Sequence, residues 1–166
     1  MFDSSEVTSF FNKETRISTL IPKDWTSATI DTSKFRFLGW SEAGFEEYFD
    51  EYKPTMSYEL STPTTSDSDW LRKLVNESNE EMALTYNQYK VINEEYCEIA
   101  NAKAYVKHYS WREENTGLTL FQMQSLIASS PFALYIINAA VLKNLEDKYM
   151  PIFKFILNST RIIPIK

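Results

Sequence analysis

The residues that build metal and redox sites are almost missing from this chain. It has one cysteine, Cys97, and one histidine, His108, among 166 residues. An internal disulfide is therefore impossible, and a zinc site of the usual His/Cys kind has too few ligands. With only three glycines, the chain also lacks the glycine-rich loops that hold phosphates. We expect a protein that uses no cofactor and no metal.

Clustered positive charge is also missing. The chain has 17 basic and 23 acidic residues, a formal net charge of −6, and its lysines and arginines are scattered. Since binding to phosphate backbones needs clustered Lys and Arg, we expect no nucleic-acid partner. The longest apolar run, 131–142, is interrupted by Asn138 and is too short to span a bilayer, so we expect no membrane span.

A signal peptide is not visible at the start, because residues 1–6 are polar and acidic. We expect a cytoplasmic protein. The alternative is the mature domain of an exported protein whose leader has been removed.

Aromatic residues are abundant. They make up 15% of the chain, and hydrophobic residues in all make up 43%. Such a composition predicts a large core, an adhesive surface, or both. The length fits a single domain over residues 1–166.

Alternating hydrophobicity predicts mostly β-strands. The predicted segments are 8–22 (a strand or a hairpin, broken at 12–14), 34–40, 55–60, 89–99, 102–111, 118–127, 132–141 and a short edge strand at 161–163. The segment 132–141 is apolar on both faces, which predicts a central strand covered from both sides.

Two segments carry an apolar stripe at helical spacing. One runs from Trp70 to Met82 and the other over 144–158, where Pro151 either kinks the helix or marks the first turn of its main part. Both stripes need an apolar surface to cover, and the predicted strands supply one. The pattern therefore predicts an α+β fold, an antiparallel sheet with helices packed on it, as in an α/β/α sandwich.

The order of these elements resembles the PsbP/Mog/DcrB-like group. The resemblance rests on Ile21-Pro22-x-x-Trp25 after a strand, the apolar strand 134–140, and a last helix with Tyr149-x-Pro151-x-Phe153. It covers nearly the whole chain, with structural motifs of low specificity. It implies a single α/β/α sandwich domain over 1–166 that is no enzyme and binds proteins. No functional residue of the group has a recognisable counterpart here.

Residues that could carry catalysis are better explained structurally. Cys97 lies between Glu95 and Glu98, which disfavours a thiolate, and His108 lies within a predicted strand. The acidic pairs Glu46-Glu47, Asp50-Glu51 and Glu113-Glu114 read as solvated carboxylates. They keep open, as the alternative, a carboxylate-based enzyme or a small-ligand-binding protein.

Two aromatic groups are candidates for binding. The first lies in the aromatic and acidic segment 40–52, and its members are Trp40, Phe45, Tyr48, Phe49 and Tyr52. These side chains form either an exposed interaction site or a cover over one end of the sheet. The second group is a row along one predicted strand, namely Tyr105, Tyr109 and Trp111 with Lys103 and Lys107. It is an open aromatic surface if no helix covers that face, and core if a helix does.

The sequence as a whole therefore predicts a non-enzymatic protein-binding module, such as an adaptor, a chaperone or an assembly factor. A structural subunit of a larger complex is a further reading.

Overall fold

The structure is a computed structural model that describes residues 6–31, 36–41, 54–63 and 69–164. The strands in these ranges are β1 (Val7–Phe11), β2 (Ile17–Pro22), β3 (Thr26–Asp31), β4 (Arg36–Ser41), β5 (Thr55–Ser61), β6 (Lys90–Ile99), β7 (Ala102–Arg112), β8 (Thr119–Ser130), β9 (Ala133–Leu142) and β10 (Arg161–Ile162). The helices are α2 (Trp70–Thr85), the 3₁₀ turn η2 (Lys143–Leu145) and α3 (Glu146–Ser159).

The described strands form two antiparallel sheets, where we expected one. The larger has seven strands in the order β3-β4-β5-β9-β8-β7-β6, and the smaller has three in the order β1-β2-β10. β9 is the fourth of the seven strands, so its predicted central place is confirmed. Of the two alternatives for 8–22, a strand or a hairpin, the hairpin is correct and consists of β1 and β2. The predicted C-terminal edge strand is confirmed as β10.

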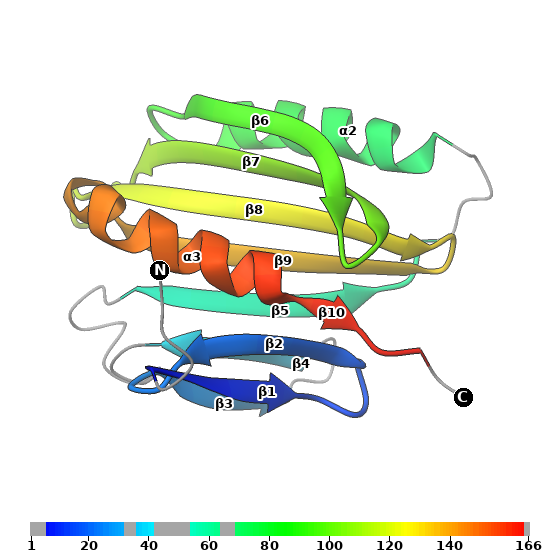
Figure 1. Ribbon diagram of the computed structural model, residues 1–166. Helices are drawn as coiled ribbons and strands as arrows, with labels where there is room; N and C mark the ends of the chain where they lie inside the picture. The colour runs from blue at the N-terminus through cyan, green and yellow to red at the C-terminus, as the bar shows by residue number, and fades with distance from the viewer. Residues whose placement is uncertain (1–5, 32–35, 42–53, 64–68, 165–166) are drawn as a thin grey trace.

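Helices cover both faces of the large sheet. In Figure 1, α3 and the small sheet lie in front of it and α2 lies behind it. On the α3 face, Phe153 is fully buried against a core that includes Ile17, Phe121 and Ile137. On the other face, a smaller cluster joins Val75 of α2 to Tyr105 and Leu126 of the sheet. The predicted sandwich of helices on an antiparallel sheet is therefore confirmed.

The small sheet is fixed to α3 by one buried and one exposed polar contact. The Thr19 hydroxyl donates to the Ile156 carbonyl at 2.8 Å, and the Leu20 amide donates to the Ser159 hydroxyl at 2.9 Å. Trp25, just after β2, packs edge-on against Phe153 with ring centroids 6.4 Å apart. The contacts at the C-terminal turn of α3 thus also hold the hairpin of β1 and β2 in place.

Pro151 lies inside α3. The sequence left two alternatives for it, a kink in the helix or the first turn of its main part. The helix begins at Glu146 after the η2 turn, and Pro151 is its sixth residue. A proline there cannot bond to the carbonyl of Asp147, which lies in the first turn. The position is therefore within the helix rather than in its first turn.

β3 was not predicted from the sequence. Its segment, Thr-Ser-Ala-Thr-Ile-Asp, lacks apolar alternation, and it forms a strand by pairing with β4 from Thr26 opposite Ser41 to Asp31 opposite Arg36. No helix in the described ranges has the length and apolar character that crossing a bilayer requires.

Candidate interaction surface

The first predicted binding group falls largely outside the described residues. This holds for Phe45, Tyr48, Phe49 and Tyr52. Trp40 lies in β4, where its backbone is opposite Met56 of β5, and its side chain is not described. A binding role for the segment 40–52 therefore stays a prediction.

The second predicted group is core, because α2 covers that face of β7. Tyr105 and Tyr109 are buried, and Trp111 is half-buried and stacks on Tyr86 with centroids 4.6 Å apart. Lys103, at the start of the strand, is exposed. Of the two readings left open for this row, the covered one is correct.

Lys107 is the unusual member of the covered row, since its side chain is fully buried. Its ammonium donates to the Asn79 side-chain oxygen of α2 at 2.6 Å and lies 5.0 Å from the centroid of the Tyr109 ring. Burial lowers the pKa of Lys107 to about 8, and the nearby Glu94 carboxylate partly opposes that shift. Tyr105 donates a hydrogen bond to this same carboxylate. The network holds α2 on the sheet and is closed to ligands.

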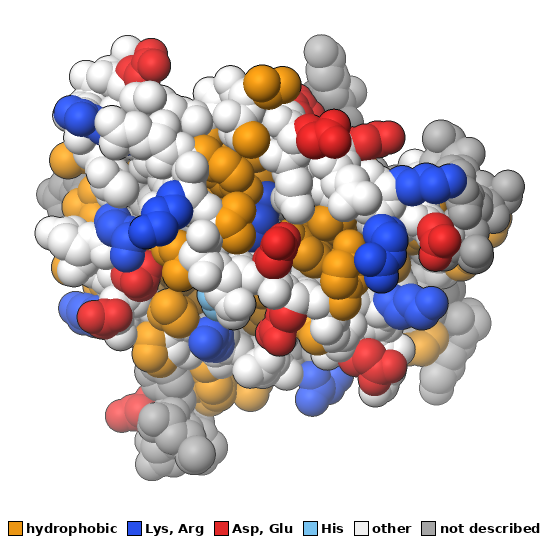
Figure 2. Space-filling view, turned by 90° about the horizontal axis from the view of Figure 1, so that it is seen from above, with side chains coloured by type: hydrophobic (Ala, Val, Ile, Leu, Met, Phe, Trp, Pro, Cys, Tyr) orange, Lys and Arg blue, Asp and Glu red, His pale blue; other side chains and the backbone are white. Residues whose placement is uncertain are grey.

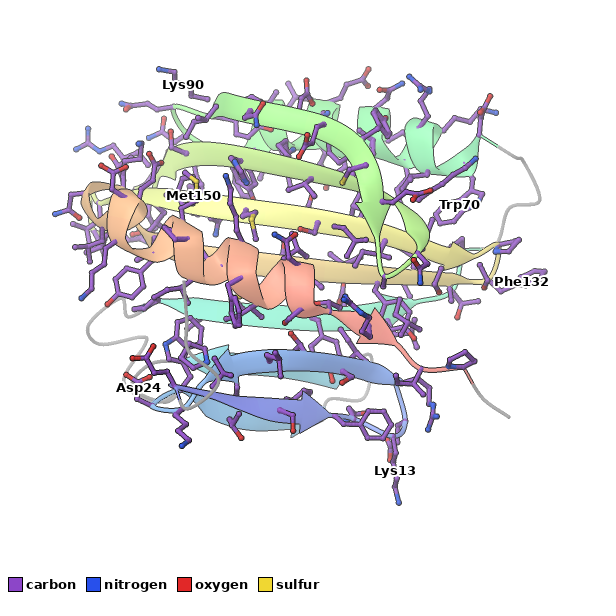
Figure 3. The ribbon with its side chains drawn as sticks, in the orientation of Figure 1. Lys13, Asp24, Trp70, Lys90, Phe132 and Met150 are labelled. Atoms are coloured by element: carbon purple, nitrogen blue, oxygen red, sulfur yellow. The ribbon has the colours of Figure 1, made fainter. Side chains whose placement is uncertain are left out.

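Among the strands that the structure describes, β6 is a free edge of the large sheet. Every residue from Lys90 to Tyr96 is exposed, and β7 is the one described strand that pairs with it. Three large apolar side chains are exposed by 40–46%, namely Val91, Ile92 and Tyr96. Figure 2 looks down on this edge and shows hydrophobic side chains interspersed with acidic ones. In Figure 3, Lys90 projects from the start of β6, and Trp70 lies at the start of α2.

The shape of β6 is set by a tight turn at one end and a bulge near the other. Ala100 and Asn101, which join β6 to β7, have φ values of 53° and 60°, as a two-residue hairpin turn requires. The register shifts between Val91 and Asn93, so Ile92 is an extra residue. Bulges and charged side chains are devices that keep edge strands from pairing without selectivity.

Beside β6, on the α3 face, lies a groove that we call the imidazole groove. Its volume is about 270 Å³, and it is lined from β6, β7, β8 and α3. The lining residues used below are Glu95, Cys97, Val106, His108, Met123 and Lys154. A more polar hollow continues past the β6–β7 turn to Asn158 and Arg161.

His108 lies at the buried side of this groove. Only 7% of the residue is exposed, and its Nε2 atom has no hydrogen-bond partner among the described residues. Burial lowers the pKa of His108, the positive charge of Lys154 lowers it further, and Glu95 works in the opposite direction. The imidazole is therefore held in its neutral form.

Cys97 and His108 do not form a nucleophile and base. Cys97 is opposite Ala104 of β7, and His108 is four residues further along that strand. At ~3.4 Å per residue, the offset along the strand alone is about 14 Å. Burial and the charge of Glu95 also raise the pKa of the Cys97 thiol, which disfavours the thiolate.

The predicted acidic groups do not assemble a catalytic site in the part that the structure describes. Glu113 accepts hydrogen bonds from the Thr116 hydroxyl and from the amides of Asn115 and Thr116. These bonds lower its pKa, whereas a general acid needs a raised one. Glu113 therefore closes a turn. The pairs at 46–47 and 50–51 lie outside the described residues. Within the described ranges, no three His, Cys, Asp or Glu side chains come together to hold a metal ion.

Comparison with known proteins gives similarity of fold without similarity of sequence. No protein-family model matches the chain, and a search of curated proteins gives no significant match. Among solved structures, it is similar to LpqN of Mycobacterium tuberculosis, which is involved in cell envelope biogenesis, with a TM-score of 0.67 and 18% identity over 95% of this chain and 91% of that one.

Two further solved structures are similar over nearly the full length of both chains. Cyanobacterial PsbP (CyanoP) from Synechocystis has a TM-score of 0.61 at 11% identity, covering 97% of this chain and 95% of that one. The Ran-binding protein Mog1p of Saccharomyces cerevisiae has a TM-score of 0.58 at 11% identity, covering 94% and 95%. At such identities the likeness concerns the fold alone. The chain thus has the PsbP/Mog-like α+β fold that the resemblance implied.

Proposed function

We propose that this protein is a protein-binding module that pairs the free edge of β6 with an extended segment of a partner. The observation that carries the proposal is the row of exposed residues from Lys90 to Tyr96 on a strand whose outer edge pairs with no described strand. An added strand gains main-chain hydrogen bonds along such an edge, and its alternate side chains reach both faces of the sheet. The exposed Ile92 and Tyr96 supply apolar contacts for those side chains.

The charge of β6 favours a basic partner. Glu94, Glu95 and Glu98 lie on this strand, and the whole chain carries a net charge of −6. Lys or Arg side chains on the incoming segment complement these carboxylates and speed the encounter. Pairing between two copies is disfavoured, because an antiparallel alignment through the strand centre brings Glu94 and Glu95 of both copies together.

The fold comparison supports a binding role. Mog1p is described as a Ran-binding protein, so a chain of this fold can act by binding another protein. Adaptor, chaperone and assembly-factor roles all fit capture of an extended segment. The aromatic residues of the segment 40–52 are a second proposed contact region.

A photo-crosslinking experiment tests the proposal. A photoreactive phenylalanine derivative replaces Tyr96 on β6 and, as the control, Leu84 on α2, which is 90% exposed. We expect the probe at Tyr96 to capture a partner peptide that contains Lys or Arg, and the probe at Leu84 to capture none. Equal capture at both positions contradicts the proposal.

Charge and apolar variants then test the mode of binding with the captured partner. Exchanging Glu95 and Glu98 together for Gln is expected to weaken binding by up to about tenfold and to flatten its salt dependence, because two exposed ion pairs are lost. Tyr96→Lys is expected to weaken binding further, and Leu84→Lys to leave it unchanged. Equal affinities of all variants in calorimetry contradict pairing at β6.

A further inference from the structure

His108 is the starting point, because a buried polar atom without a partner is rare. Among the described side chains, the buried nitrogen and oxygen atoms without a hydrogen-bond partner are His108 Nε2 and Ser125 Oγ. Most such atoms in native proteins are satisfied by protein groups or water, and an exception needs an explanation. His108 lines the imidazole groove, so a molecule in that groove can reach the imidazole.

The groove has the size of a site for a small molecule. Its volume of about 270 Å³ greatly exceeds the ~30 Å³ share of one water, and falls just below the ~300–1,000 Å³ of sites for drug-sized ligands. Val106, Met123 and Leu157 contribute apolar surface to the lining. The site therefore suits a compact molecule with an apolar part.

Charges of both signs line the groove from different elements. Glu95 and Glu98 come from β6 and Lys154 comes from α3. Besides burial, the charge of Lys154 lowers the pKa of His108, and the charges of Glu95 and Glu146 raise it. The closeness of both groups to one imidazole places a carboxylate and an ammonium around the same small space. Glu95 repels a purely anionic ligand there, and Lys154 repels a purely cationic one. A molecule with one charge of each sign satisfies both groups.

We propose that the imidazole groove binds a zwitterionic small molecule of the amino-acid class. Its ammonium group pairs with Glu95, its carboxylate pairs with Lys154 and accepts a hydrogen bond from Nε2–H of the neutral His108 imidazole, and its apolar side chain packs on Val106 and Met123. This site shares Glu95 with the β6 edge, but His108 and Lys154 lie on β7 and α3, so Lys154→Met tests the groove without changing the edge, and either proposal can fail without the other.

The single histidine makes a direct test possible. When the protein is labelled with ¹⁵N-histidine, the imidazole nitrogen signals in its NMR spectrum come from His108 alone. The probes are L-leucine, L-methionine and L-phenylalanine, with N-acetyl-L-leucine and L-leucinamide as relatives that each lack one charge. We expect a saturable shift of the Nε2 signal with at least one amino acid, and about tenfold weaker binding of its two singly charged relatives.

Variants separate a built site from nonspecific contact. Glu95→Gln and Lys154→Met are each expected to weaken binding of the responding amino acid by about tenfold or more. The controls are Glu114→Gln and Lys148→Met, both exposed and outside the groove lining, and they are expected to bind as the wild type does. No Nε2 shift with any of the three amino acids at millimolar concentration overturns the proposal. Equal shifts in the groove variants and the controls overturn it as well.

Cys97 supplies a second readout that does not depend on the histidine signal. It is the single cysteine and lines the same groove. We expect the responding amino acid to slow alkylation of Cys97 by iodoacetamide in the wild type and not in Lys154→Met. Unchanged alkylation in the wild type at a saturating concentration contradicts binding in this groove.

Discussion

At the scale of single residues, Lys107 shows how a charge is tolerated inside the fold. Its ammonium is covered by α2, bonds to Asn79 and lies over aromatic rings. Because its folded pKa of about 8 is below the ordinary 10.5, the unfolded chain binds more protons than the folded one between these values. The contribution of Lys107 to stability therefore rises with pH in that window, by about 1 kcal/mol between pH 8 and ~9.

Lys107→Met removes this titration. We expect the free energy of unfolding of the wild type, minus that of Lys107→Met, to rise from pH 8 upward in urea titrations. The comparison has to stop before pH 10, because burial raises the pKa of Tyr58 to about 12 and raises that of Tyr105, so the fold loses stability as unfolded tyrosines ionise. The control is Lys103→Met, at the exposed start of the same strand, which should keep the wild-type slope. Parallel curves for wild type and Lys107→Met contradict the account of a buried, titrating lysine.

At the scale of elements, the turn between β6 and β7 determines where the free edge ends. Ala100 has a φ of 53°, a conformation that costs a non-glycine residue about 1 kcal/mol and that Asn adopts more readily. We therefore expect Ala100→Asn to raise the free energy of unfolding by about 0.5 kcal/mol in thermal or urea unfolding. Ala102→Asn, in the adjacent strand, is expected to lower it. A loss of stability in Ala100→Asn contradicts the argument from turn geometry.

The elements also show which features a sequence can predict. The two apolar faces of β9 predicted its central place, since a strand covered on both sides needs no polar face. The polar segment of β3 gave no such signal, because its strand depends on pairing with β4. The edge position of β6 depends on the order of strands in the sheet. The alternation of apolar and polar residues along one segment does not predict that order. The adjacent residues Glu94 and Glu95 are the one local feature of the sequence that indicates an exposed strand.

At the scale of the whole molecule, layers that are distant in sequence create the surfaces of interest. The imidazole groove forms where α3, near the C-terminus, lies beside β6 and β7. Neither His108 nor Lys154 marks such a site in the sequence, since they are 46 residues apart on a strand and a helix. The predicted sandwich was correct, but the depth and charge of the space between its layers follow from packing alone.

The central claim is that a partner adds a strand to the edge of β6. Amide hydrogen exchange of the protein alone and with the crosslinked partner peptide tests it most directly, because added main-chain hydrogen bonds slow exchange at the edge itself. The account predicts new protection within Lys90–Ile99 and little change in α2 or β10. Unchanged exchange in β6, with protection appearing instead in the segment 40–52 or on a helix, would contradict it.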